Sequence, residues 1–335
     1  MITVEHLTKC YGDFTAVDDL SFEIEEGHVY GFLGPNGAGK STTMNIMTGC
    51  LSATEGRVLI DGYDIFEEAD KARRLIGYLQ EQPPLYMNET PREYLKFVGE
   101  AKGLKGKELE RQIEDVIART KIDDVKNRMI SKLSKGYKQR VGIAQALLGN
   151  PKVIILDEPT VGLDPIQIIE IRELIRQLGQ EHTVILSSHI LSEVQTICEK
   201  VLIIAKGKLV AYDEPENLEK LLTSNEVIVQ TEASGEEIDE LLDGFEGIAG
   251  WSSEETENGT IRVSIKPEQD DSDDICRRLF FAFAAKERAI LEMTAKKANL
   301  EDIFIELTES GQPEADETEA GEPEGKEAES EVDDQ

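Results

Sequence analysis

The sequence predicts an α/β protein with a largely parallel, helix-covered sheet and an inserted helical subdomain, followed by an α+β accessory domain and a disordered tail. Short β-branched runs alternate with helical patterns through residues 1–215, which is typical of a parallel sheet. Residues 216–310 carry four further strand patterns and two helical ones. Residues 311–335 carry 11 acidic side chains, one basic one and no aromatic residue, so they cannot form a core.

In the first region, β-branched runs predict strands and apolar periodicity predicts helices. A helix is expected to begin near Lys40. Residues 90–104, 107–120 and 134–148 repeat apolar residues at helical spacing, with no strand pattern between them, and Pro91 is placed to begin a helix. We therefore predict a helical subdomain at about 88–150, inserted into a domain that spans 1–215. The predicted strands are 29–34, 57–62, 74–79, 153–159, 183–189 and 201–212.

The accessory domain, 216–310, has the element order β-α-β-β-α-β, which is that of a ferredoxin-like unit. A closing helix, NLEDIFIELTE, is expected at 299–309, and 311–335 is the disordered acidic tail. The elements are a strand at 226–231, a helix at 236–245, strands at 247–253 and 260–265, a helix at 272–286 and a strand at 289–295.

Composition excludes several classes of protein. The formal net charge of -32 argues against nucleic acid as the main ligand, because phosphate backbones are held by Lys and Arg. The longest apolar run, about 279–285, is far shorter than the ~20 residues of a membrane-spanning helix. The N-terminal residues show neither the basic nor the apolar region of a secretory signal, so we expect a cytoplasmic protein. The four cysteines, Cys10, Cys50, Cys198 and Cys276, lack metal-binding spacing and are expected to be free, buried thiols.

A phosphate-binding loop is predicted at GPNGAGKS, which begins at Gly34 and fits the pattern GxxxxGK[ST]. It follows a predicted strand and precedes a predicted helix, as the motif requires. Its glycines allow backbone N–H groups to surround phosphate oxygens, and the helix N-terminus adds the positive end of its dipole. We therefore expect a P-loop NTPase in which Lys40 reaches the β- and γ-phosphates and Ser41 ligates Mg²⁺.

Two carboxylates follow the buried run VIIL. Asp157 stands at the C-terminal tip of that strand, where α/β folds place ligands, and suits Mg²⁺ coordination through water. Glu158 would then face the water that attacks the γ-phosphate, as a general base or as its positioner.

These residues also carry a family resemblance: the chain resembles the ATPase subunit of an ABC transporter. LSKGYKQR at 133–140 resembles the family signature LSGGQ, Gly162-Leu163-Asp164 resembles the D-loop, and His189 resembles the switch histidine. With the two phosphate motifs, these stand in the family's order over residues 1–215. The signature region and LEDIFIELT near the C-terminus are most similar to the multidrug and gliding-motility type of bacterial exporter ATPase.

The resemblance implies a head-to-tail homodimer, or a pair with another ATPase subunit, in which one subunit's signature caps the ATP bound at the other's loop. His189 would hydrogen-bond the γ-phosphate. Tyr11 would stack on adenine, although a tyrosine there could equally be a packed strand-end residue. The implied ATP-binding residues are Tyr11, Gly34, Pro35, Asn36, Gly37, Ala38, Gly39, Lys40, Ser41, Thr42, Ser134, Gly136 and Asp164.

The sequence departs from the family at two motifs. At the Q-loop, YLQEQPPLY places Glu81 at the usual glutamine position with Gln80 just before it, and which of the two reaches Mg²⁺ stays open. In the signature, Lys135 and Tyr137 differ from the standard form. The expected catalytic residues are Glu158, His189 and Lys40 with Gln80 or Glu81, and the expected metal ligands are Ser41, Asp157 and Glu81.

The family function is ATP hydrolysis that drives transport, and the subfamily indicates export through a separate integral membrane permease. That permease is expected to dock near 81–87, which would hold the chain on the inner face of the cell membrane, with no membrane contact of its own. One alternative is a soluble ABC ATPase acting on ribosomes or nucleic acid, which the single cassette and acidic chain disfavour. Another is a nucleotide-sensing regulator, which would not need Glu158 and His189. The accessory domain could bind a regulator, but we expect it to brace the cassette or aid dimerisation.

Overall fold

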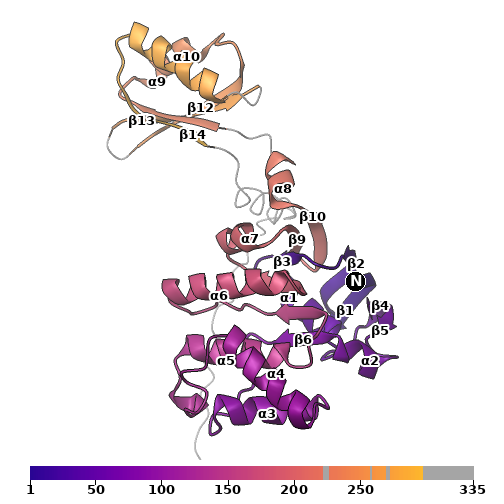
Figure 1. Cartoon of the computed structure of the whole chain (residues 1–335). Coiled ribbons are helices and arrows are strands. Elements are labelled where there is room, and N and C mark those ends of the chain that lie inside the picture. The colour runs from indigo at the N-terminus through magenta and orange to yellow at the C-terminus, as the bar shows by residue number, and fades with distance from the viewer. Residues whose placement is uncertain (222–225, 257–258, 269–271, 297–335) are drawn as a thin grey trace, which may run out of the picture.

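A six-stranded sheet forms the centre of the first region in the computed structural model, which describes residues 1–221, 226–256, 259–268 and 272–296 (Figure 1). Its order is β10-β9-β3-β8-β7-β6, parallel throughout except for the antiparallel β10. Every residue of β3, β7 and β8 is buried, as in a sheet covered on both faces. The strands are β3 (Val29–Leu33), β6 (Ile76–Leu79), β7 (Val153–Leu156), β8 (Thr183–Ser188), β9 (Lys200–Ala205) and β10 (Lys208–Asp213).

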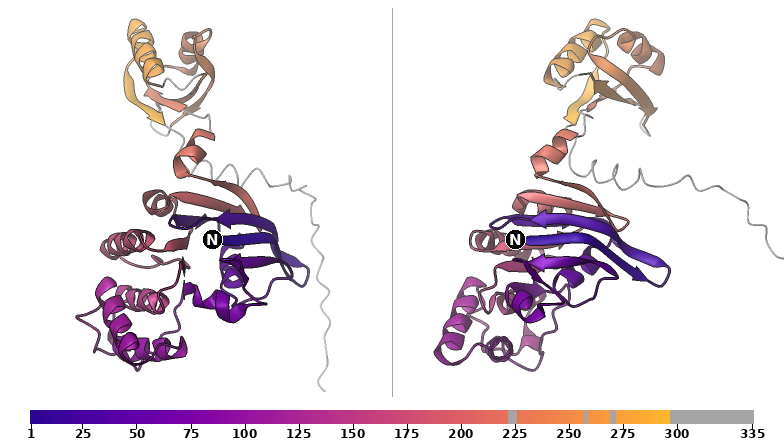
Figure 2. Two further views of the ribbon diagram at one scale, coloured as in Figure 1. Left: turned by 45° about the vertical axis from the view of Figure 1, so that its right-hand side comes forward. Right: turned by 90° about the vertical axis from the view of Figure 1, so that its right-hand side faces the viewer.

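A second, antiparallel sheet of order β2-β1-β4-β5 is missing from the sequence prediction (Figure 2). The run at 57–62 belongs to it as β4, not to the parallel sheet, and the run at 201–212 is the hairpin β9-β10. The register of β1 against β2 shifts three times before Cys10, which breaks the alternation that would reveal a half-buried strand. Its strands are β1 (Ile2–Tyr11), β2 (Phe14–Ile24), β4 (Glu55–Ile60) and β5 (Tyr63–Asp64).

The predicted helical subdomain is present between β6 and β7. Pro91 is the first residue of α3, and Thr90 caps it: the Glu93 backbone N–H donates to Thr90 Oγ1 at 3.3 Å, while Glu93 Oε2 accepts from the Thr90 N–H at 2.9 Å. The elements are α3 (Pro91–Ala101), α4 (Gly106–Arg119), the 3₁₀ turn η1 (Ile130–Lys132) and α5 (Lys135–Leu147). The other cassette helices are α1 (Lys40–Met47), α2 (Ala69–Arg74), α6 (Pro165–Gly179) and α7 (Leu191–Ile197).

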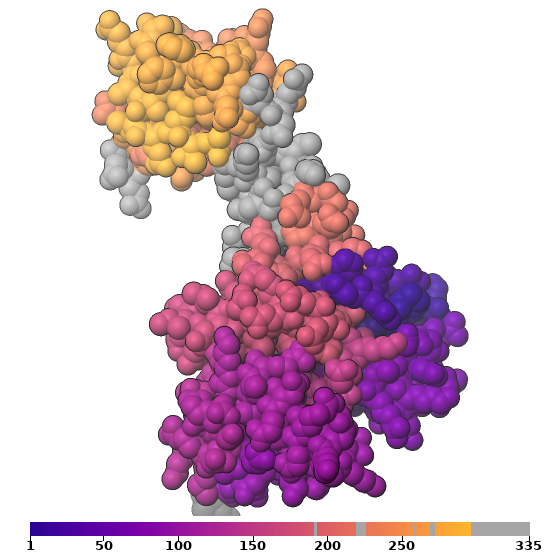
Figure 3. Space-filling model, viewed as in Figure 1, coloured from indigo at the N-terminus to yellow at the C-terminus, as the bar shows by residue number. Residues whose placement is uncertain are grey.

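The C-terminal unit follows α8 (Pro215–Leu221) and stands apart from the cassette (Figures 1 and 3). Its antiparallel sheet has the order β12-β13-β11-β14, so the first and third strands are central, as in a ferredoxin-like unit. Helices α9 and α10 share its core, with Ile238, Leu279 and Phe283 fully buried. The elements are β11 (Glu226–Thr231), α9 (Gly235–Leu242), β12 (Ile248–Glu255), β13 (Ile261–Pro267), α10 (Ser272–Ala285) and β14 (Ile290–Lys296). The helix expected at 299–309 and the tail at 311–335 lie outside the described residues.

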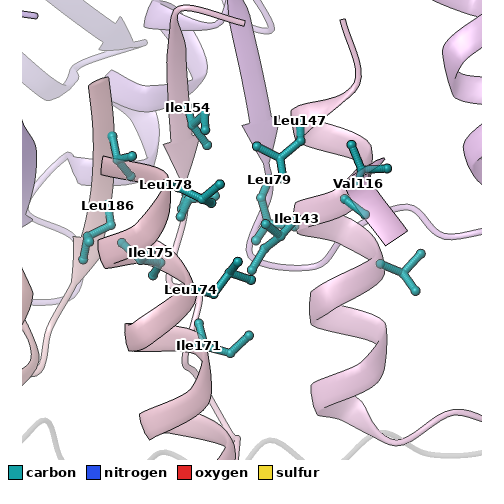
Figure 4. Close-up of a cluster of buried hydrophobic side chains, with 14 of the residues drawn as sticks. Leu79, Val116, Ile143, Leu147, Ile154, Ile171, Leu174, Ile175, Leu178 and Leu186 are labelled. Atoms are coloured by element: carbon teal, nitrogen blue, oxygen red, sulfur yellow. The ribbon is translucent and has the colours of Figure 1, made fainter. Parts of the chain in front are cut away.

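An apolar cluster joins the helical subdomain to the central sheet (Figure 4). One face of α6 presents Ile171, Leu174 and Leu178 toward Leu79 of β6 and Ile143 of α5. All are buried, so burial of apolar surface holds α5 and α6 side by side. This places the N-terminal ends of these helices close together.

None of the described helices combines the length and apolarity that a membrane crossing needs. All four cysteines are free, as predicted, but the expectation of burial is correct only for Cys198. Cys50 is exposed because it lies in the turn that follows α1, and Cys10 and Cys276 are half-buried.

Candidate active site

The loop between β3 and α1 is shaped by backbone contacts that only glycine permits. A Cβ on Gly34 would lie 2.3 Å from the carbonyl oxygen of Ile204, and one on Gly39 would lie 2.5 Å from that of Ala16. Gly39 also has φ +104°, a conformation that favours glycine. Gly39 is the N-cap of helix α1, which begins at Lys40. The N-terminus of this helix faces a pocket.

A pocket of about 470 Å³ opens over this loop. Helix α1 contributes its first three residues, and the ends of β7 and β8 contribute Glu158 and His189. The residues that line it are Tyr11, Phe14, Ala16, Asn36, Gly37, Gly39, Lys40, Ser41, Thr42, Glu81, Glu158, Val161 and His189.

Lys40 is a buried cation held by two backbone carbonyl groups. Its Nζ donates to the carbonyl oxygens of Gly34 at 2.7 Å and Pro35 at 3.2 Å. Burial lowers the pKa of Lys40, and the charges of Glu158 and Asp157 oppose that shift. Because carbonyl oxygens carry only partial charge, an incoming phosphate offers this ammonium a stronger partner.

Asp157 directly follows β7 and is 4% exposed. Its hydrogen bonds connect this strand to α1 and β8. Its Oδ1 accepts from Ser41 Oγ at 3.3 Å and from Ser187 Oγ at 2.6 Å, and Ser187 Oγ in turn accepts from the Glu158 N–H at 2.8 Å. A hydroxyl beside a carboxylate is an oxygen donor set that fits Mg²⁺, which usually takes its remaining ligands from phosphates and water.

Glu158 and His189 contact each other at the pocket wall. The His189 Nδ1 to Glu158 Oε2 distance is 2.9 Å, and Glu158 is 8% exposed. Glu158 has φ +48°, a left-handed conformation that is uncommon outside glycine and that gathers at functional sites. Because β7 and β8 are adjacent and parallel, their carboxyl ends bring the two side chains to one edge of the sheet.

The Q-loop contributes one of its two candidates. Glu81 lines the pocket, whereas Gln80, half-buried at the end of β6, is not among the lining residues. Phe14, Ala16 and Val161 also line it and are missing from the sequence prediction. The sequence offered a signal for Phe14, since it begins β2 directly after a two-residue turn and is the cross-strand partner of Tyr11.

The predicted residues of the signature and D-loop, Ser134, Gly136 and Asp164, are not among the residues that line this pocket. Ser134 Oγ accepts from the Tyr137 N–H at 3.4 Å and caps α5, and Asp164 Oδ1 accepts from the Gln167 N–H at 2.9 Å and caps α6. A Cβ on Gly136 would lie 2.6 Å from the Gln167 side chain, so the two helix starts are adjacent. One chain therefore brings together the residues of the loop, β7 and β8, but not these three.

Comparison with known proteins decides the family. Residues 17–161 match the family described as ABC transporter. The chain is 39% identical over 234 residues to the lantibiotic transport ATP-binding protein SrtF of Streptococcus pyogenes, covering 69% of this chain and 99% of that protein. It is 31% identical over 310 residues to the linearmycin resistance ATP-binding protein LnrL of Bacillus subtilis, covering 92% and 98%. The chain belongs to the ABC transporter ATP-binding family.

A solved ABC ATPase supports the activity of the site. The dimeric, post-hydrolysis structure of the cassette MJ0796, bound to ADP and Pi, superposes with a TM-score of 0.59 at 28% identity, covering 64% of this chain and 98% of that one. As an ABC ATPase, this chain binds and hydrolyses ATP.

Proposed function

We propose that two copies of this chain, or this chain and a paired ATPase subunit, close head to tail around ATP and drive export through a separate integral membrane permease. The observation that carries the proposal is the separation of the signature residues from the phosphate pocket within one chain. Since neither Ser134 nor Asp164 lines the pocket of its own chain, we assign their helix N-termini to the γ-phosphate that another subunit presents. The names of SrtF and LnrL, with lantibiotic transport and linearmycin resistance, support export.

Within this dimer we assign a role to each site residue predicted from the sequence. Lys40 neutralises charge on the β- and γ-phosphates. Glu158 accepts a proton from the attacking water or orients that water. His189 hydrogen-bonds to the γ-phosphate and keeps Glu158 in position. Ser41 and Asp157, with Glu81, would hold Mg²⁺, which supplies neutralisation of the phosphate oxygens. The N–H groups of Gly34 to Thr42 surround the phosphates, and Tyr11, 49% exposed, stacks on adenine.

The permease is proposed to dock on an apolar patch beside the Q-loop, which we define as Tyr86, Met87, Phe97 and Met129. All four side chains are exposed, and the rings of Tyr86 and Phe97 lie 5.1 Å apart. The Ser131 N–H donates to the Met87 carbonyl at 2.9 Å, which ties the Q-loop segment to the helical subdomain. Exposed apolar groups at one place mark interaction sites, so the 81–87 segment predicted from sequence becomes one edge of this patch. Docking there would hold the chain on the cytoplasmic face of the membrane.

ATP turnover measured against protein concentration tests the dimer. Specific activity is expected to rise with concentration, because two chains complete each site. Glu158→Gln should lower kcat about 10²- to 10⁴-fold while size-exclusion in ATP and Mg²⁺ still shows a dimer. Turnover that is independent of concentration, or a Glu158→Gln variant with wild-type turnover, would contradict the proposal.

Recovery of the permease from gently solubilised membranes tests the patch. Tyr86→Ser with Phe97→Ser should lower the yield of the co-purified membrane protein about tenfold, since aromatic anchors dominate interface energies. Phe66→Ser is the matched control, because Phe66 is another exposed phenylalanine of the cassette. Equal recovery with the wild type, the double variant and the Phe66→Ser control would show that the permease docks elsewhere.

A further inference from the structure

Glu193 is a buried carboxylate to which none of the sequence motifs assigns a role. It lies in the first turn of α7 and is 2% exposed. Its Oε2 accepts from Thr160 Oγ1 at 2.6 Å and from Ser188 Oγ at 3.2 Å. An ionised carboxylate at such depth is costly unless it is paired, so these contacts must serve a purpose.

The partners of Glu193 come from the two segments that carry the hydrolytic residues. Thr160 is two residues after Glu158, and Ser188 directly precedes His189. Glu193 therefore connects the segment after β7 to the end of β8, in addition to the direct His189–Glu158 contact. A third partner, Arg172 of α6, places its Nη2 3.4 Å from Glu193 Oε1. Helix α6 begins directly after the D-loop residue Asp164. The ion pair with Arg172 therefore also connects Glu193 to the helix that follows the D-loop.

The ion pair is incomplete. In the described part of the chain, Arg172 Nε and Glu193 Oε1 are the only buried side-chain nitrogen and oxygen atoms without a hydrogen-bond partner. Buried ion pairs of this kind add little to folding stability, and apolar residues of similar size often replace them without loss. A buried pair whose remaining atoms are unsatisfied calls for an explanation other than stability.

We propose that Glu193 is a positioning residue for ATP hydrolysis: it fixes His189 and the segment after Glu158 as one unit and links that unit through Arg172 to α6. The proposal rests on the roles proposed above for Glu158 and His189. It assigns Glu193 no contact with ATP or water, so its effect must pass through the position of His189.

Kinetics and histidine NMR of the full chain together test this role. Glu193→Gln keeps an oxygen for the two hydroxyls but removes the charge that faces Arg172. We expect kcat to fall about tenfold, with the ATP Kd changed less than about twofold, because the lost interaction is a charged hydrogen-bonded one. The ring resonance of His189, identified by its loss in His189→Ala, should shift in this variant, while those of His6 and His28 stay fixed.

Thr160→Val provides a second route in case the first variant does not fold, because it removes only the 2.6 Å hydrogen bond. Glu173→Gln is the matched control: this exposed glutamate lies one residue from Arg172 on α6 and pairs with Arg176. An unmoved His189 resonance overturns the proposal, whatever happens to kcat. A moved resonance with wild-type turnover would also overturn it, because the shift of His189 would then have no effect on hydrolysis. The turnover of His189→Ala separates the two proposals: its loss would uphold the hydrolytic role of His189 even where that of Glu193 fails.

Discussion

The two halves of the ATP site differ in how complete they are within one chain. On the phosphate-loop side, Lys40, Asp157 and Glu158 are buried and already bonded to neighbours around a formed pocket. On the signature side, Ser134 and Asp164 do no more than cap their own helices. Under the proposed dimer, one chain would therefore be enough to receive the nucleotide, whereas hydrolysis would need the signature of a second chain.

The strongest test of this difference disables one half of the site in one variant and the other half in a second variant. Lys40→Ala removes the loop cation, and Gly136→Asp puts a carboxylate at the start of α5, where it would repel a γ-phosphate. Each homodimer should lose at least about 100-fold in turnover, as when one preorganised oxyanion contact is removed. An equal mixture should regain about a quarter of wild-type activity, because half of its twofold dimers hold one intact site of two.

The mixture discriminates between assembly modes. Recovery requires that the intact loop and the intact signature come from different chains. No recovery, with both variants folded and mixed dimers shown by cross-linking, would mean that each chain completes its own site.

The same contrast governs what the sequence could predict. Loop residues such as Lys40 and the strand-end Glu158 were found because short-range spacing fixes their chemistry, and the structure places them in one pocket. The N-terminal sheet was missed because bulges in β1 erase its alternation. Ser187 and Glu193 carry no local signal, because their hydrogen bonds go to residues on other strands and loops, which only the folded chain reveals.

If adenine stacks on Tyr11 as proposed, its binding belongs to the half of the site that one chain forms, so the effect of losing Tyr11 should not depend on dimerisation. Tyr11→Ala is expected to raise the ATP Kd about tenfold, since stacking of a base on an aromatic ring contributes ~1–3 kcal/mol. Equilibrium binding of a fluorescent ATP analogue to dilute, monomeric protein measures this, and Tyr11→Trp should restore the affinity. If Phe14→Ala has the larger effect instead, adenine stacks on Phe14, which lines the same pocket.

The smallest expected effect concerns the Q-loop, where the structure favours one of two candidates. Glu81 lines the pocket and Gln80 does not. If Glu81 contributes a charged oxygen to Mg²⁺, Glu81→Gln should weaken that contact by about 1 kcal/mol and raise the Mg²⁺ concentration for half-maximal turnover roughly fivefold. Gln80→Ala, the neighbouring control, should leave it unchanged. The reverse result would place Gln80 at the metal in the closed dimer. The phosphate-loop side of the site would then rearrange when the second subunit binds. In that case the difference between the phosphate-loop side and the signature side would describe only the open, single chain.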